Sequence, residues 1–393
     1  MTDDVVIVGG GPAGASAACR LARAGRAPLV IERDRAPRHR ICGEFLSVEA
    51  QAYLRDLGLD PLALGGAPIR RVRLACGRDL VEAALPFEGV GLTRRTLDAA
   101  LLRQAEAFGA RVRRGPVVRA VSGEGSGLRV DLRDGEAIRA STVLLATGKH
   151  DLHAPRRPVQ RHRNGLVGFK TYLALDPAER ARLGDAVEVA LFEGGYAGLQ
   201  AVEGGLVNLC LLVRGDVFAR AGRDWPGLLR HFAEASPHLG ARLAGARDRL
   251  ARPLSIAGVP YGFVHRDEGE APAGLLRLGD QMGVIPSFSG DGIAIAMHSA
   301  GVAAATILEG GSAGAYHARM RADIGRPIRL ACALSALSAA PLGRGLLLAA
   351  LRLEPRLLRM LAAWTRIPAP RLRSGRAAGP APVAASPLDG LAR

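Results

Sequence analysis

The chain has few aromatic residues, almost no lysine and no paired cysteines. Aromatic side chains make up 4% of its 393 residues, which leaves little surface for stacking on nucleic-acid bases. Its only lysines are Lys149 and Lys170, so arginine supplies nearly all of the positive charge. The five cysteines are scattered and contain no C-x-x-C pair, which argues against a disulfide framework and against a zinc site. We therefore expect a protein of a reducing compartment with no bound metal.

The positive charge is concentrated toward the C-terminal end. The net charge is +16, and from Arg319 onward 13 arginines accompany only three acidic residues. Because this excess occupies the last fifth of the chain and aromatic residues are scarce, we predict no nucleic-acid partner. A basic C-terminal surface is more typical of contact with a membrane surface or with an acidic partner.

The N-terminus lacks the pattern of a secretory signal. Its apolar run, residues 5–8, is too short, and Asp3 and Asp4 stand where a basic flank is expected. We predict a cytoplasmic protein, and peripheral contact with the inner face of the membrane through the basic C-terminal helices stays open.

The first thirty residues carry the strongest motif. Residues 5–8 form a short apolar run, which predicts a buried parallel strand. Gly9, Gly11 and Gly14 follow as G-x-G-x-x-G. In that pattern the first glycine makes a tight turn, the second admits a pyrophosphate, and the third lets helix pack on strand. The spacing predicts a dinucleotide site.

The residues around these glycines agree with such a site. Pro12 and Ala13 begin the helix, where the missing N–H of a proline costs nothing and an anion can rest on free amides. A second strand over residues 28–31 ends at Glu32, whose carboxylate would accept hydrogen bonds from a ribose. An acid there rejects a 2′-phosphate, so FAD and NAD remain as the fixed ligand.

The remaining chain alternates between strand and helix patterns. Residues 149–165 are polar and read as a linker, and residues 326–364 are helical but interrupted by Pro341, Arg344 and Pro355, so they are no clean transmembrane span. We expect helices at 48–57, 93–108, 225–235, 237–250 and 293–309, and strands at 69–75, 80–85, 117–122, 128–132, 137–140, 142–146, 168–175, 186–192, 197–202, 206–213 and 275–278.

The order of three motifs resembles a known superfamily. After the glycine motif, one strand ends at Thr147-Gly148 and a late strand leads into Gly279-Asp280. This order is similar to that of the FAD-dependent oxidoreductases that include aromatic hydroxylases, flavin-dependent halogenases and geranylgeranyl reductases. The resemblance covers about residues 3–310.

The resemblance implies an α/β fold, in which a Rossmann-like FAD-binding domain is combined with a smaller β-sheet substrate domain and a C-terminal helical segment. We expect the FAD domain at residues 1–160 and 265–325, the substrate domain at 161–264, helices at 326–366 and a disordered tail at 367–393.

The resemblance also implies cofactor contacts. Asp280 would bind the ribityl chain, and the helix after Gly292 would point its N-terminus at the flavin. Arg94 and Gln104 match family positions that contact FAD, and solvated helix residues are the alternative for both. The full expected set is Gly9, Gly11, Pro12, Ala13, Gly14, Glu32, Arg33, Arg40, Arg94, Gln104, Val118, Thr147, Gly148, Gly279, Asp280, Pro286, Gly290 and Gly292.

The loop Arg40-Ile41-Cys42-Gly43-Glu44 supplies the candidate catalytic residues, Cys42 and Glu44. The family places this loop beside the flavin. A carboxylate in a closed pocket would have a raised pKa and could act as a general base. Two alternatives stay open: Cys42 as a small packed side chain, and Glu44 as an acceptor for backbone amides near the helix that starts at Val48.

The sequence also departs from the family patterns. Residues 147–150 replace the Asp-Gly pair of hydroxylases, and the halogenase stretch W-x-W-x-I-P is absent, which disfavours halogenation. Residues 196–202 keep the tyrosine of the reductase stretch but lack its tryptophan and proline. His150 and His153 have no nearby ligand-type carboxylates, so we assign no metal site.

We predict an FAD-dependent monooxygenase. It would use NADPH or NADH as a transient co-substrate and dioxygen to oxidise an apolar aromatic or polyketide-like small molecule. One alternative is an FAD-dependent reductase of isoprenoid or polyene double bonds. Another is a membrane-associated flavin-binding protein without turnover. The oligomeric state stays open.

Overall fold

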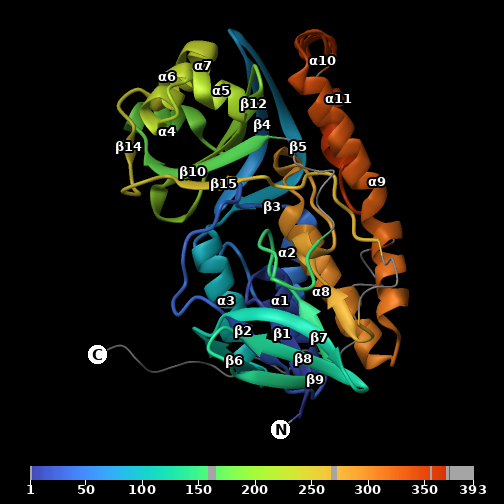
Figure 1. The fold of residues 1–393 in the computed structure, drawn as a ribbon. Helices are drawn as coiled ribbons and strands as arrows, with labels where there is room; N and C mark the ends of the chain where they lie inside the picture. Colours follow the sequence, from blue (N-terminus) through green and yellow to red (C-terminus); the bar gives the residue numbers. More distant parts are fainter. Residues whose placement is uncertain (1, 158–164, 267–271, 355, 369–370, 372–393) are drawn as a thin grey trace.

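The computed structural model describes residues 2–157, 165–266, 272–354, 356–368 and 371 (Figure 1). Two sheets and their covering helices confirm the predicted α/β fold. Of the predicted tail, only Ile367, Pro368 and Arg371 are described, and residues 158–164 of the predicted linker also lie outside the described residues.

The first sheet is built around β1 (Thr2–Val8), which pairs in parallel with β2 (Leu29–Glu32) and β9 (Ala137–Leu145). The parallel strands β6 (Arg111–Arg114) and β16 (Leu275–Arg277) extend it beside β2 and β9. An antiparallel meander of β7 (Val118–Glu124) and β8 (Gly127–Leu132) continues from β9.

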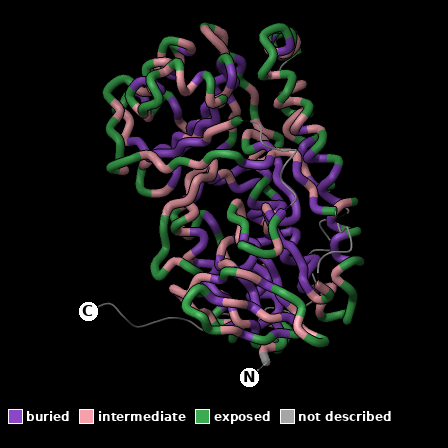
Figure 2. The backbone as a smooth tube through the Cα atoms, in the orientation of Figure 1, coloured by how far each residue is buried: buried purple, intermediate pink, exposed green. Residues whose placement is uncertain are grey.

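Alternation along β1 separates two cores. Val5 and Ile7 face the core that holds α1 (Pro12–Arg23), α2 (Val48–Asp56), α3 (Arg94–Ala107) and α8 (Gly292–Leu308), while Val6 and Val8 face the meander. Buried backbone is concentrated around these elements in Figure 2. The carboxyl ends of β1, β2 and β9 are thereby held together, where parallel sheets bind ligands.

The second sheet has the order β14-β10-β13-β12-β11-β4-β5-β3, with β15 paired to β10. Its strands are β3 (Phe45–Leu46), β4 (Ala67–Cys76), β5 (Asp79–Gly91), β10 (Leu166–Ala174), β11 (Ala186–Phe192), β12 (Gly195–Ala201), β13 (Val207–Arg214), β14 (Arg247–Asp248) and β15 (Leu254–Ala257). The short helices α4 (Pro177–Leu183), α5 (Gly215–Arg220), α6 (Trp225–Ala235) and α7 (Pro237–Leu243) accompany it.

This sheet corrects the predicted division of strands. Strands β3, β4 and β5 belong to the second sheet, whereas the sequence predicts residues 1–160 as part of the FAD domain alone. The reason is the parallel pairing of β4 with β11, which joins segments that lie more than a hundred residues apart. A local sequence pattern carries no sign of such a pairing.

Several element boundaries also differ from the prediction. The helix expected at 237–250 ends at Leu243, because Gly245 has a positive φ of 71° and Asp248 then pairs with β10. The two strands expected at 137–140 and 142–146 form the single strand β9. Strands β6 and β15 and helices α4 and α5 were not predicted.

Three helices complete the C-terminal part: α9 (Ala313–Ala339), α10 (Pro341–Leu353) and α11 (Arg356–Trp364). They stand along one edge of the molecule, next to β5 (Figure 1). Helix α9 starts before the expected residue 326, because Ser312 caps its N-terminus by accepting from the Ala315 amide. Within the described residues no single helix is long and apolar enough to cross a membrane; α9 and α10 together reach that length and composition, but the chain bends by 105° between them.

Candidate active site

A cavity of about 1120 Å³ lies where the two sheets and the C-terminal helices meet. It exceeds the roughly 300–1,000 Å³ of ordinary small-molecule sites. The expected residues that line it are Gly9, Gly11, Pro12, Ala13, Glu32, Arg33, Arg40, Cys42, Glu44, Arg94, Val118, Thr147, Gly148, Gly279, Asp280, Gly290 and Gly292.

Three expected residues do not line the cavity. A Cβ on Gly14 would lie 1.9 Å from the Gly9 carbonyl oxygen, which agrees with a packing role between helix and strand. Pro286 is buried between lining residues and accepts from the Ser289 hydroxyl. The Gln104 amide lies beside Gly58, at the end of α2, which favours the alternative of a helix residue outside the site.

The glycine turn at the end of β1 is shaped to receive an anion. Gly9 has a φ of 108°, and a Cβ there would lie 2.5 Å from the Ala146 carbonyl oxygen. A Cβ on Gly11 would meet only the Arg94 guanidinium, at 3.2 Å. No side chain caps α1, so the amides of its first turn remain available at the cavity.

Glu32 holds its carboxylate at the cavity wall through two backbone amides. Oε2 accepts from the Gly10 N–H at 2.7 Å, and Oε1 accepts from the Asp34 N–H at 2.9 Å. The side chain is buried, so its position at the end of β2 is fixed. Oε1 also accepts from the Arg40 guanidinium at 3.4 Å, whereas Oε2 keeps a free lone pair, which suits a hydroxyl donor such as a ribose.

The other end of the cavity lies between the Gly279-Asp280 turn and the start of α8. The Asp280 carboxylate pairs with the Lys149 ammonium at 3.2 Å and holds the pKa of Lys149 above its ordinary value. A Cβ on Gly292, the first residue of α8, would meet nothing within 4 Å. This end therefore has open space beside a helix N-terminus, where a ring that carries negative charge is stabilised.

Glu44 lies in a buried polar cluster behind the loop of residues 40–44. Its side chain is fully buried, and its Oε1 lies 2.5 Å from the Lys170 ammonium and 2.7 Å from the Arg94 amide nitrogen. The Tyr172 hydroxyl donates to both carboxylate oxygens, at 2.7 and 2.9 Å. Burial raises the pKa of Glu44, and Lys170 opposes that rise.

The structure also identifies which backbone amide Glu44 binds, and it differs from the one expected. The amide it accepts from belongs to Arg94, the first residue of α3, and not to the helix that starts at Val48. Glu44 has a φ of 61°, so its backbone is also strained. With both oxygens engaged by the protein, the arrangement favours a role in positioning the loop over proton transfer.

Cys42 is only partly buried and reaches the cavity. The Asn208 amide donates to the carbonyl oxygens of Cys42 and Gly43, at 3.1 and 2.7 Å, which anchors the loop to β13. Gly43 has open space where a Cβ would stand. Of the two candidate catalytic residues, Cys42 is the better placed to meet a ligand.

Away from this polar end the cavity becomes an apolar chamber between the second sheet and the three C-terminal helices. Valine and leucine side chains of the sheet form one wall, and leucine side chains of the helices form the other. The residues of the apolar chamber are Val72, Leu74, Leu85, Val187, Val189, Leu191, Leu334, Leu347, Leu351, Leu358 and Leu361.

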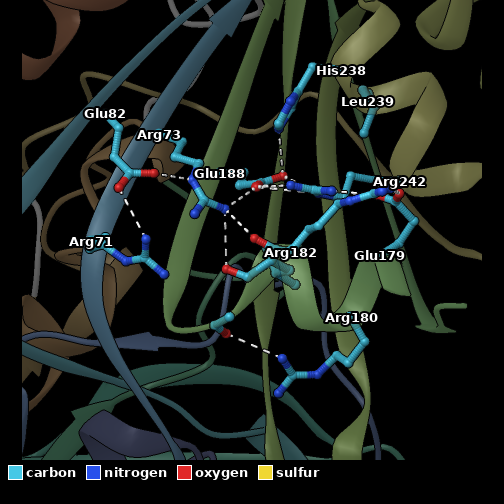
Figure 3. A network of polar contacts seen from close by, with 12 residues as sticks. Arg71, Arg73, Glu82, Glu179, Arg180, Arg182, Glu188, His238, Leu239 and Arg242 are labelled. Atoms are coloured by element: carbon cyan, nitrogen blue, oxygen red, sulfur yellow. Dashed lines mark hydrogen bonds and ion pairs between the residues drawn. The ribbon is translucent and has the colours of Figure 1, made fainter. Parts of the chain in front are cut away.

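The opposite face of β4 and β11 packs on a second apolar core and also carries a buried ion cluster. Glu188 lies between Arg73, at 2.8 Å, and Arg242, at 3.0 Å, and His238 contacts it at 3.0 Å (Figure 3). Arg242 also pairs with Glu179 of α4. This network fixes the two strands that form one wall of the apolar chamber.

Residues 2–166 match the family model described as "FAD binding domain". The N-terminal part of the chain is an FAD-binding domain, and the protein is an FAD-dependent oxidoreductase. The menaquinone reductase of Mycolicibacterium smegmatis is 26% identical to this oxidoreductase over 324 residues, 78% of this chain and 77% of that protein. The menaquinone reductase of Mycobacterium tuberculosis is 30% identical over 52% of this chain and 54% of its own length. Squalene epoxidase 4 of Arabidopsis thaliana is 40% identical over 84 residues, 21% of this chain and 16% of its own.

Solved structures share the fold of the oxidoreductase. The flavin-dependent brominase Bmp2 superposes with a TM-score of 0.72 at 19% identity, over 92% of this chain and 94% of that one. Halogenase PltM in complex with phloroglucinol and FAD gives 0.69 at 16% identity, over 86% and 76%. At such low identities the likeness shows the fold alone.

FAD is the cofactor of this enzyme, and the cavity fits it. The uncapped start of α1 would hold the pyrophosphate, and Glu32 the ribose of the adenosine. Asp280 and the start of α8 would hold the ribityl chain and the flavin.

The oxidoreductase contains site residues that the motifs did not indicate. Lys149, Tyr196 and Ser287 line the polar end, Tyr261 lines a small pocket that adjoins it, and Lys170 supports Glu44. One signal was present: only two of the 53 cationic residues are lysines, and both lie at this site. A lysine in a chain that otherwise uses arginine indicates a local need for a compact ammonium.

Proposed function

We propose that this oxidoreductase reduces a carbon–carbon double bond of an apolar, isoprenoid-type molecule. The observation that carries the proposal is the apolar chamber, which continues the cavity beyond the flavin end. A long hydrocarbon chain would fill it and bury aliphatic surface on both sides. Two curated relatives named menaquinone reductase support this substrate class, because a menaquinone carries an isoprenoid chain.

The chain's own residues would place the double bond and supply a proton. Bound FAD supplies hydride transfer from NADPH or NADH, the proposed co-substrate. Tyr261 is hydrogen-bonded to the Ser287 hydroxyl at 2.7 Å, and burial raises its pKa to about 12. Tyr261 therefore stays protonated at neutral pH and can donate a proton, and Cys42 lines the cavity nearby. Lys149 keeps Asp280 neutralised beside them.

The monooxygenase remains a second candidate. It is favoured by the 84 residues that match squalene epoxidase 4 of Arabidopsis thaliana, which is described as an epoxidase. The same cavity would admit an apolar substrate, and dioxygen would replace the double bond as the acceptor of electrons.

Product analysis distinguishes the two reactions. Purified holoenzyme would receive NADPH and a menaquinone with an unsaturated side chain, once under strict anaerobic conditions and once in air. A reductase yields a product that has gained two hydrogen atoms in both cases. A product that has gained an oxygen atom, formed only in air, would replace the proposal with the monooxygenase.

A further inference from the structure

Helix α10 exposes an apolar face to the outside of the protein. Leu342, Leu346 and Leu353 are 85%, 69% and 87% exposed, and Ala349 between them is also exposed. These positions follow a spacing of four, three and four residues, so they form one stripe along the helix. A stripe of this kind on the surface marks a contact site.

The opposite face of α10 is the wall of the apolar chamber. Leu347 and Leu351 line the cavity, and Leu348 packs against Leu74 and Leu191. One helix is therefore apolar on both sides, with solvent outside and the chamber inside. If α10 served only to cover the chamber, polar side chains would be expected on its solvent-facing side.

Helix α11 continues the surface with the residues of a membrane interface. Met360 and Trp364 are 42% and 55% exposed, and Arg356 and Arg359 are exposed on the same side of the helix. Neither arginine forms an ion pair with another described residue. Aromatic, aliphatic and arginine side chains on one face are typical of helices that lie in the headgroup region.

We propose that the outer face of α10 and α11 binds an anionic phospholipid bilayer, from which the apolar substrate enters the chamber. Leu342, Leu346, Leu353, Met360 and Trp364 would enter the headgroup region, and Arg356 and Arg359 would contact lipid phosphates. A second copy of the chain is the less suitable occupant, because a two-fold contact would bring each arginine-bearing surface against itself. The substrate class rests on the function proposed above, whereas membrane binding does not.

Flotation with vesicles tests the proposal without any substrate. The holoenzyme would be mixed with phosphatidylcholine vesicles and with vesicles that contain about 30% phosphatidylglycerol. We expect it to float with both and more strongly with the anionic ones. The variant Leu342→Ser/Leu346→Ser/Leu353→Ser should lose at least about tenfold in partition coefficient on both vesicles. Leu62→Ser/Leu308→Ser, which changes leucines 40% and 36% exposed outside α10 and α11, is the control and should bind normally.

A variant without two of the arginine charges measures the electrostatic contribution to membrane binding. Arg356→Gln/Arg359→Gln should weaken binding to anionic vesicles by about 20- to 30-fold at low salt and leave binding to phosphatidylcholine nearly unchanged. Arg103→Gln/Arg230→Gln, on exposed positions of α3 and α6, is its control. Flavin content and melting temperature would show that every variant is folded.

Three outcomes would overturn the proposal. The wild-type enzyme could fail to float with any vesicle, or the leucine variant could float as well as the wild type. The wild type could also be a dimer in sedimentation that the leucine substitutions dissociate, with no vesicle binding, which would assign the face to a second copy. None of these outcomes bears on whether the enzyme reduces a double bond.

Discussion

Two glutamates at the second sheet are almost completely buried, yet their surroundings differ. Glu188 meets two arginines and a histidine, whereas Glu44 meets one lysine, one tyrosine hydroxyl and one backbone amide. Burial by itself would raise both pKa values. Around Glu188 the hydrogen bonds outweigh burial and lower the pKa to about 2, but around Glu44 burial prevails.

The difference indicates that the cluster around Glu188 stabilises the fold, whereas the cluster around Glu44 belongs to the cofactor site. Glu188 lies on the face of the sheet that the helices cover, where its excess of cations keeps it ionised. Glu44 lies on the cavity side, where a single buried lysine balances it. We infer that the first carboxylate serves stability and that the second serves the shape of the flavin loop.

The largest expected effect comes from removing Glu188. Glu188→Leu would leave Arg73 and Arg242 buried beside each other with one acceptor fewer, so we expect the free energy of unfolding to fall by about 3–5 kcal/mol. Urea denaturation measures this. Glu193→Leu, at an exposed ion pair just beyond the end of the same strand, should cost less than about 1 kcal/mol. Equal stability of Glu188→Leu and wild type would show that the network is replaceable.

Acid should weaken the Glu188 cluster. Its pKa lies below the unfolded value, so the unfolded chain binds more protons and stability falls as the pH drops from about 5 toward about 2. The pKa shift corresponds to about 3 kcal/mol. The raised pKa of Glu44 acts in the opposite direction, because the stability it contributes is complete at low pH and is lost as the pH rises through the folded pKa. Urea titrations of wild type and Glu188→Gln should run parallel above about pH 5 and converge as the pH falls toward about 2; curves that stay parallel over the whole range would contradict the assignment.

How far the sequence predicts these features depends on the distance between partners. Gly9 to Glu32 lie within one short β-α-β segment, so their spacing alone predicts the dinucleotide site. Glu44 and Lys170, like Arg73 and Glu188, meet only because strands far apart in the chain become neighbours. The local sequence around each of these charged residues is typical of an exposed position. The residues become buried only when β4 pairs with β11 and β10 pairs with β13.

Removing the charge of Glu44 should have a smaller effect on stability. Glu44→Gln leaves Lys170 without its counter-ion, but a lysine can lose its proton when buried, so we expect a loss of about 1–3 kcal/mol. Flavin occupancy should fall, because the loop of residues 40–44 lines the cavity, while activity per bound flavin should be retained. A drop of about 10²–10⁴-fold in turnover per flavin, with normal stability, would instead make Glu44 the general base.

The smallest effect on stability should come from a change at Tyr172. It tests whether the Tyr172 hydroxyl holds Glu44 in place or whether the ring only fills space. Tyr172→Phe removes a hydroxyl that donates to both oxygens of Glu44, at a cost of about 0.5–1.5 kcal/mol. Since that donation lowers the pKa of Glu44, its loss should raise the pKa further, which infrared absorption of the protonated carboxyl would detect. In the double variant Tyr172→Phe/Glu44→Gln, the two stability losses should sum to more than the measured loss, because both changes break the same contact. Strict additivity would mean that the hydroxyl stabilises the fold through its other neighbour, His39, and that Glu44 is held by Lys170 and the Arg94 amide alone.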